Sequence, residues 1–174
     1  MDNLIWVDIE TGGLDPHHDK ILEIAVVITD KDFNVICPAH YVIHRSENYL
    51  ARMSTWCKKV HTMNGLIDEC INSRMRLTEV EGLLIHMIDE YAFNMPLCGN
   101  SVHFDRKFLE HYMPAFMHHV SYRNVDVSTL YELVGRWAPT KLSKVEKTSN
   151  HRALNDVVSS IDELKLYRKY CMKV

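Results

Sequence analysis

Three runs of apolar residues near the start of the chain predict β-strands. Residues 4–7 form a short run, and residues 21–29 and 35–43 form two longer runs rich in β-branched side chains. Polar residues 30–34 separate the two longer runs and are typical of a hairpin turn. The chain therefore begins with three predicted strands, of which the second and third form a hairpin.

Helical patterns then dominate. Residues 47–74 predict short helical turns that break at Gly65. Thr78-x-x-Glu81 has the form of a capping box and predicts the start of a longer helix. Apolar residues recur at helical spacing along that helix at Val80, Leu83, Leu84, Met87, Ile88 and Tyr91.

The second half alternates strands and helices. Residues 96–99 predict a short buried strand, and a helical stripe follows at Phe104, Phe108, Leu109 and Tyr112. Another strand precedes Asp126, a helix covers residues 129–137, and a final helix runs from about residue 151 to 170. This order predicts an α/β sandwich with a mixed sheet.

Size and composition narrow the class of protein. The 174 residues, 47% hydrophobic and 25% charged, predict one domain spanning residues 1–174. A net charge of −3 argues against a protein that coats long nucleic acid, but a very short nucleic acid could bind. The five cysteines form no C-x-x-C pair and predict reduced thiols.

No secretion signal or membrane-spanning run is expected. The first ten residues lack a basic region followed by an apolar segment, and no stretch of about 18 apolar residues occurs. We therefore expect a cytoplasmic protein that does not contact membranes, and a mitochondrial pool stays open.

Asp8 and Glu10 are the first candidates for chemistry. Residues two apart in a strand face the same side, so both carboxylates project together after the apolar residues 4–7. A divalent cation would offset their repulsion. Alternatively, they mark a strand end in water. Gly12-Gly13 favours the metal hypothesis, because glycine allows a sharp turn and a close backbone approach to a ligand.

Three later residues are further candidates. Asp105 lies one turn into a helix, where a carboxylate also simply stabilises the helix N-terminus. His151 and Asp156 would lie about 140° apart on a regular helix. Both can serve one cleft if His151 precedes the helix, with Ser149 or Asn150 as N-cap. A histidine at a helix start is otherwise ordinary polar surface.

Taken together, these residues resemble the DEDDh exonuclease superfamily. The order D-x-E-x-G-G, then a helical Asp, then H-x-x-x-x-D on the last helix carries this resemblance. More narrowly, the chain is similar to oligoribonucleases in W-V-D-I-E-T-G-G-L-D-P, C-G-N-S-V-H-F-D-R-K-F-L, Y-R-N-V-D-V-S-T-L-Y-E-L and S-N-H-R-A-L-N-D. The resemblance implies an RNase H-like three-layer sandwich with a five-stranded mixed sheet, and 3′→5′ exonuclease activity on short RNA, down to dinucleotides.

The resemblance also implies roles for the candidate residues. Asp8, Glu10, Asp105 and Asp156 would bind two Mg²⁺ or Mn²⁺ ions per site, and His151 would act as general base. The implied substrate-binding residues are Leu14, Trp56, His61, Ser101, His103, Tyr122, Arg123 and Ser128.

Tyr122 and Arg123 would come from the second subunit of a homodimer, and Tyr122 would also take part in the active site. On the residues alone, Leu14 is as readily a core residue and Trp56 a helix anchor.

Several positions differ from the common oligoribonuclease pattern, and three other functions stay open. Gly12 lies in E-T-G-G-L where E-M-T-G-L is usual, and His103, Ser121 and Asn155 replace the usual Gln, His and Asp. These differences concern substrate fit. The alternatives are a DEDDh nuclease acting on longer RNA or DNA, an inactive RNA-binding or protein-interaction module, and a metal-dependent phosphatase of small nucleotides.

Overall fold

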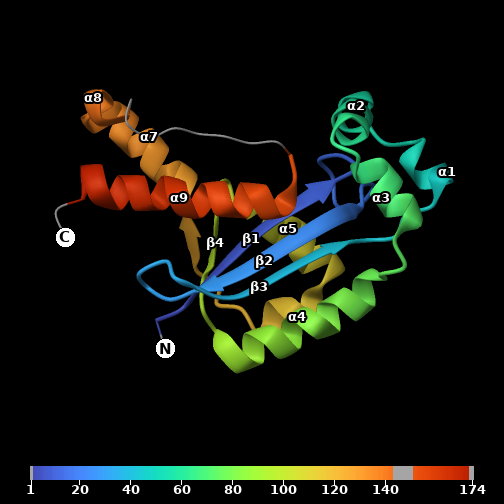
Figure 1. The fold of residues 1–174 in the computed structure, drawn as a ribbon, viewed down its shortest axis with the longest axis horizontal. Helices are drawn as coiled ribbons and strands as arrows, with labels where there is room; N and C mark the ends of the chain where they lie inside the picture. Colours follow the sequence, from blue (N-terminus) through green and yellow to red (C-terminus); the bar gives the residue numbers. More distant parts are fainter. Residues whose placement is uncertain (1, 143–150, 173–174) are drawn as a thin grey trace.

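The computed structural model describes residues 2–142 and 151–172, and a five-stranded sheet forms its centre (Figure 1). The strands are β1 (Leu4–Thr11), β2 (Ile21–Thr29), β3 (Val35–Val42), β4 (Leu97–Gly99) and β5 (Asn124–Asp126). Their order across the sheet is β3-β2-β1-β4-β5. The first three strands are antiparallel, and β4 and β5 run parallel to β1 and to each other. The predicted mixed sheet is confirmed.

Helices cover the sheet and extend one end of it. They are α1 (Glu47–Leu50), α2 (Thr55–Met63), α3 (Leu66–Asn72), α4 (Leu77–Tyr91), α5 (His103–Tyr112), α6 (Pro114–His118), α7 (Val127–Trp137), α8 (Pro139–Leu142) and α9 (Ala153–Cys171). Figure 1 shows α9 along one face of the sheet and α4 along the other. None of the helices in the described part of the chain has the length and apolarity needed to cross a membrane.

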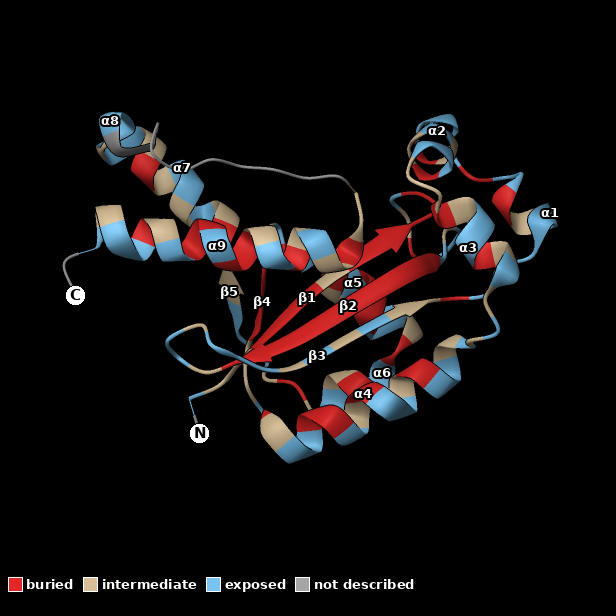
Figure 2. Cartoon of the chain, viewed as in Figure 1, coloured by how far each residue is buried: buried red, intermediate tan, exposed pale blue. Residues whose placement is uncertain are grey.

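Alternate residues of β1 and β2 pack into two cores. Ile5, Val7 and Ile9 face α4, α5 and α6, in a cluster that also holds Ile24 and Val26. Trp6, Ala25 and Val27 face the other way and pack with residues of α7 and α9. Figure 2 shows β2 buried along its length and β1 buried over most of it, whereas β3 has only exposed and half-buried residues. Because β1 is covered on both faces, any polar residue within it needs a specific partner.

The short helices α1, α2 and α3 form a small lobe at the end of β1. Leu22 of β2 contributes to their core with Leu50, Met53 and Leu66. The predicted break at Gly65 is confirmed: this residue has φ of +81° and precedes α3. Only glycine adopts this backbone conformation at little cost.

The capping prediction for α4 was wrong by two residues. The helix begins at Leu77, and the Glu79 carboxylate accepts a hydrogen bond of 2.8 Å from the Arg76 amide. Glu81 instead accepts from the amide of Phe116 in α6, at 3.1 Å. Glu81, which the local sequence assigned to the cap, therefore links α4 to α6 instead.

Candidate active site

Asp8 and Glu10 lie within β1 rather than beyond its end, and both belong to the face of the sheet covered by α9. In the antiparallel register Asp8 is paired with Ala25, and Glu10 with Glu23. Ala25 packs in the same cluster as Ala153 at the start of α9. The two carboxylates therefore point from the sheet toward the first turn of α9.

Asp105 reaches the same strand from α5. It is buried in the first turn of that helix, and its Oδ1 accepts a hydrogen bond of 3.0 Å from the Ile9 amide. Strand β4 pairs with β1 only at Ile5 and Trp6, so the Ile9 amide lies past the end of that ladder. A long-range contact with β1, rather than stabilisation of its own helix alone, explains why Asp105 is buried.

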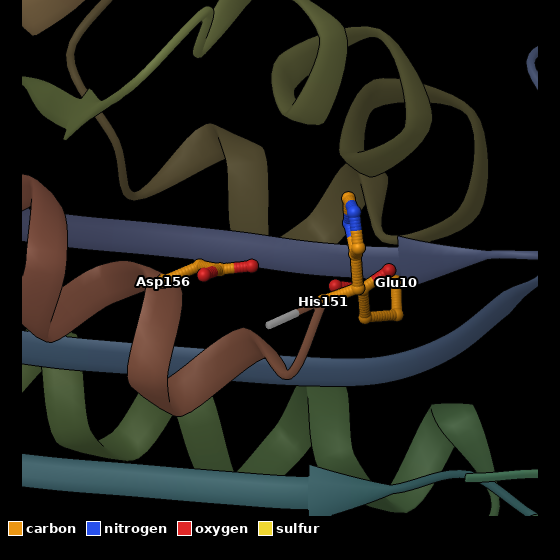
Figure 3. Close-up of side chains that lie close together, drawn as sticks. All are labelled: Glu10, His151 and Asp156. Atoms are coloured by element: carbon orange, nitrogen blue, oxygen red, sulfur yellow. The ribbon is translucent and has the colours of Figure 1, made fainter. Parts of the chain in front are cut away.

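His151 and Asp156 complete the cluster. Helix α9 starts at Ala153, with Arg152 at the N-cap position and His151 one residue earlier. The prediction that Ser149 or Asn150 is the N-cap was wrong, because Arg152 occupies that position; both residues lie outside the described residues. His151 has φ of +54° and is not helical, so the angle of 140° on a regular helix does not separate it from Asp156. Ligand atoms of Glu10, His151 and Asp156 lie within 4.8 Å of one another (Figure 3).

Burial and mutual repulsion perturb these carboxylates strongly. Burial, together with the negative charges of Asp156, Glu23 and Asp105, raises the pKa of Glu10 to about 8. Burial also raises the pKa of Asp105 to about 8, and burial together with neighbouring carboxylates raises the pKa of Asp8 well above its usual range. Perturbed acids gathered in one place are typical of a functional site.

This arrangement fits a divalent metal ion. Most of the donors are hard carboxylate oxygens, the ligands that Mg²⁺ and Mn²⁺ prefer. A bound cation would also stabilise the ionised form of acids that now resist ionisation. The residues present therefore suit the divalent metals on which the exonuclease superfamily depends.

Gly12 and Gly13 are required because neighbouring side chains leave no space for a Cβ, rather than because the backbone makes a left-handed turn. A Cβ on Gly12 would lie 2.1 Å from the hydroxyl oxygen of Tyr49, and one on Gly13 would lie 2.3 Å from a carboxylate oxygen of Asp19. Neither glycine has a positive φ. The close approach predicted for a ligand is made by side chains of the protein itself.

Leu14 and Trp56 are exposed, which contradicts the alternative that they are core or anchor residues. Leu14 is 77% exposed and Trp56 is 60% exposed. The Trp56 indole lies edge-on to the His151 imidazole, with ring centroids 5.4 Å apart. An exposed apolar ring beside the candidate base leaves a surface on which a nucleobase could stack.

His61 is buried beneath the site. Its Nε2 lies 3.1 Å from the carbonyl oxygen of Thr11 and 3.8 Å from Glu10 Oε2. Burial lowers the pKa of His61, so its ring is neutral near pH 7 and this contact is not an ion pair. His61 supports Thr11 and Glu10 from below, and its contact with substrate stays a prediction.

Ser101, His103 and Ser128 gather around Asp126, at the end of β5. Asp126 Oδ1 accepts from the amide of Ser101 at 3.0 Å and from both the amide and hydroxyl of Ser128, at 3.0 and 2.6 Å. His103 Nδ1 lies 3.8 Å from Asp126 Oδ2. Asp126, which the sequence showed only as a strand end, organises three of the predicted substrate-binding residues.

Tyr122 and Arg123 lie between α6 and β5. Tyr122 is 81% exposed, and the Arg123 guanidinium donates to its hydroxyl at 3.2 Å. Arg106 fixes this segment from behind by donating to the carbonyl oxygen of Ser121 at 2.8 Å and to Asn124 Oδ1 at 2.9 Å. The segment thus presents a large aromatic side chain to solvent from a well-anchored backbone.

The sequence did not indicate Glu23, Arg152 and Asn64. Arg152 contacts both Glu23 and Asn64, and Asn64 also contacts the backbone of His151. One signal was available: Glu23 is the single charged residue in the apolar run of residues 21–29. A charge in such a strand requires a buried partner.

Comparison with other proteins places the chain in a known group. Residues 5–164 match the family model RNase_T, described as Exonuclease. Oligoribonuclease from Haemophilus ducreyi is 41% identical over 175 residues, covering 99% of this chain and 96% of that protein. Oligoribonuclease from Actinobacillus pleuropneumoniae is 43% identical over 171 residues, covering 97% and 93%.

Solved structures show the same fold. A structure of exonuclease I has a TM-score of 0.75 at 19% identity over 98% of this chain. A complex of Escherichia coli exonuclease I with a dT13 oligonucleotide gives a TM-score of 0.73, also at 19% identity. This chain spans about two fifths of those longer chains, 42% in both cases. The likeness confirms the RNase H-like fold.

Proposed function

The chain belongs to the oligoribonuclease family of exonucleases, and from this membership we propose that it is a divalent-metal-dependent 3′→5′ exoribonuclease of short RNA. Its preferred substrates are RNA oligonucleotides of two to a few nucleotides, which it cleaves to 5′-mononucleotides. One exonuclease domain, residues 1–174, carries this activity in the cytoplasm. The five free cysteines support a reducing compartment.

One observation carries the proposal: carboxylates from three distant parts of the chain converge beside a histidine. Glu10 from β1 and Asp156 from α9 lie within reach of one ion, and His151 lies with them. Asp105 contacts β1 between Asp8 and Glu10, at the Ile9 amide. Phosphodiester hydrolysis needs cations at the phosphate and a base for water, and this cluster offers residues for both.

Asp8, Glu10, Asp105 and Asp156 would hold two Mg²⁺ or Mn²⁺ ions. When bound, the ions supply charge stabilisation for the attacking and leaving oxygens and lower the pKa of water. His151 accepts the proton of the attacking water, because a neutral imidazole is the side chain suited to this task near pH 7. Trp56, edge-on to His151, restricts the position of that ring.

Short substrates match the remaining side chains. Leu14 and Trp56 offer apolar surface to two bases without reading their identity. Ser101, His103 and Ser128, held by Asp126, would surround the 5′ phosphate, and His61, beside Glu10, would also contact the substrate. Only a few phosphates are bound, so a chain with net charge −3 needs no long basic surface.

We propose further that the active form is a homodimer in which Tyr122 and Arg123 complete the partner's site. An 81% exposed tyrosine on an anchored segment supports this arrangement. The test mixes two inactive variants, His151→Ala and Tyr122→Ala, after separate purification and subunit exchange. Random exchange makes half of the dimers mixed, and in each mixed dimer one of the two sites has both His151 and Tyr122. About a quarter of the wild-type activity therefore returns. If Tyr122 acts within its own chain, the mixture stays inactive.

Substrate length is tested by incubating the purified protein and Mn²⁺ with labelled RNA of two, seven and twenty nucleotides. The proposal predicts fastest cleavage of the dinucleotide, with two mononucleotides as products and weak dependence on salt. An untouched dinucleotide beside a degraded long strand would replace the short-RNA specificity with a general exonuclease. Release of inorganic phosphate would indicate a phosphatase instead.

A further inference from the structure

Arg152 lies between the candidate base and the last helix, and its guanidinium contacts three other elements. Nε donates to Glu23 of β2 at 3.0 Å, and Nη2 lies 2.9 Å from the same carboxylate. Nη1 and Nη2 donate to the two oxygens of Glu69 on α3, at 2.8 and 2.7 Å. Nη1 also donates to the carbonyl oxygen of Asn64 at 3.4 Å. One side chain therefore links the sheet, the α2–α3 lobe and the start of α9.

Glu23 is the buried end of this connection. Its side chain is fully buried, and it accepts from the Ala153 amide at 3.0 Å and contacts His40 Nε2 at 2.6 Å. Because Arg152 has no side-chain oxygen to cap α9, Glu23 satisfies this amide from another strand. Glu23 is also the register partner of Glu10 in the antiparallel strands β2 and β1. The residue that holds the first turn of α9 therefore lies directly across from a proposed metal ligand.

Asn64 holds the other side of the same segment. Its Nδ2 donates to the carbonyl oxygen of His151 at 2.6 Å, while its Oδ1 accepts from the Leu66 amide at 3.2 Å. The carbonyl of Arg152 accepts from the Asp156 amide at 3.0 Å. The backbone before Arg152 belongs to the proposed base, His151, and the carbonyl of Arg152 bonds to the proposed metal ligand Asp156. A shift of Arg152 would therefore displace both residues.

His151 needs such support. Its φ of +54° is a left-handed conformation that a residue with a side chain adopts only at an energetic cost, so surrounding contacts must hold it there. Without them the segment before α9 would relax toward an ordinary backbone, and the imidazole would move away from Glu10 and Asp156.

We propose that Arg152, acting with Glu23 and Asn64, is a positioning residue that holds His151 in its left-handed conformation for proton abstraction. This inference rests on the proposed nuclease function. Arg152 does not contact the substrate; it fixes the position of the His151 imidazole. A planar guanidinium is required, because a lysine cannot bind the carboxylates of Glu23 and Glu69 in two-pronged contacts.

The decisive variant is Arg152→Lys, which keeps the positive charge beside Glu23. We expect kcat on a diribonucleotide to fall about 10- to 100-fold, with KM changed less than about threefold, since misplacing a reacting group by about 1 Å costs on the order of 100-fold. Arg45→Lys is the matched control. Arg45 also binds the backbone of β2, at the carbonyl oxygen of Ile21, but does not contact His151.

Asn64→Ala provides a second variant that leaves the buried ion pair intact. It should also lower kcat while the protein stays folded. Loss of the hydrogen bond from the Leu66 amide to Asn64 is controlled by Ser46→Ala, which removes the side-chain N-cap of α1 and should leave kcat unchanged. If Arg152→Lys fails to fold, Asn64→Ala decides the question.

A spectroscopic measurement separates positioning from general destabilisation and from failure of the proposed function. The His151 Cε1–H signal in protein with ¹³C-labelled histidine is assigned by its loss in His151→Ala. Because His151 lies edge-on to Trp56, its shift reports the ring geometry. Arg152→Lys and Asn64→Ala should displace this signal; Arg45→Lys should not.

Two results have different meanings. An inactive wild-type protein would refute the nuclease function, while the displaced signal would still support the positioning contact. An active wild type with unchanged kcat and an unmoved His151 signal in folded Arg152→Lys would overturn the positioning role of Arg152; where that variant does not fold, the same result in Asn64→Ala would overturn it.

Discussion

Neutralising Glu10 should stabilise the metal-free protein, although it removes a proposed metal ligand. Glu10→Gln keeps the shape of the side chain and removes the charge. The carboxylate is buried. Glu10 lies opposite Glu23 in the antiparallel register, and a carboxylate oxygen of Glu10 lies within 4.8 Å of one of Asp156. In the absence of metal, each ionised acid in this cluster raises the free energy of the folded state.

The magnitude follows from the pKa of Glu10. Folding raises this pKa from 4.5 to about 8, so the folded state binds the proton more tightly than the unfolded state. The destabilisation is absent below pH 4.5, grows as pH rises and is complete above pH 8. At 1.36 kcal/mol per pH unit it reaches about 4 kcal/mol at pH 7.5 and stays below about 1 kcal/mol at pH 5. For a domain of this size, this corresponds to roughly 10 °C in Tm.

The assay is thermal unfolding in EDTA from pH 5 to pH 8.5. Glu10→Gln should unfold at a higher temperature than wild type at pH 7.5 and at nearly the same temperature at pH 5. Added Mg²⁺ should raise the Tm of wild type and close the gap. Glu47→Gln, which removes an exposed carboxylate on α1, should show no such pH dependence. A gap that is absent or equal at both pH values would refute the view that Glu10 is a repelled, buried acid.

Two further predictions concern buried thiols and glycines. Burial raises the pKa of Cys70 and Cys98 to about 12, so iodoacetamide at pH 8 should modify the partly exposed Cys37 and Cys171 first; mass spectrometry showing early labelling of Cys98 would contradict the packing of β4. A Cβ on Gly99 would lie 2.8 Å from the carbonyl oxygen of Val7, so Gly99→Ala should destabilise by about 1–3 kcal/mol. Gly82→Ala on the open face of α4 should stabilise by about 0.5–1 kcal/mol, and chemical denaturation giving both the same sign would be the contrary result.

Local patterns predicted the elements well wherever one periodicity dominated. The bounds of β2 match the apolar run of residues 21–29, and the predicted stripe of α4 supplies the buried residues Val80, Leu84, Met87 and Ile88. The start of α4 was misplaced because Glu81 serves a tertiary contact with Phe116, which no local pattern reveals. Strand β1 extends to Thr11 and its acids are covered by α9 and α5, whereas the sequence predicted that the apolar run ends at Val7 and left a strand end in water as an alternative for Asp8 and Glu10.

The site divides in the same way. Residue types and order indicated Asp8, Glu10, Asp105, His151 and Asp156, because metal-dependent hydrolysis constrains them directly. Their supports were not visible, since Glu23 meets Arg152 across 129 positions of sequence, and Asn64 meets His151 across 87. Such contacts depend on how α9 lies over the sheet. The sequence also left Leu14 and Trp56 undecided between core and surface, a distinction that only packing determines.

The most direct test of the carboxylate and histidine site compares wild type with His151→Ala in two measurements on the same samples: single-turnover hydrolysis of a diribonucleotide, and Mn²⁺ binding by calorimetry. If His151 is the base, the variant loses at least about 100-fold in rate and binds Mn²⁺ as wild type does. His151 also lies within ligand distance of Glu10 and Asp156. Loss of Mn²⁺ affinity in parallel with rate would make it a metal ligand, and a rate close to that of wild type would remove it from catalysis.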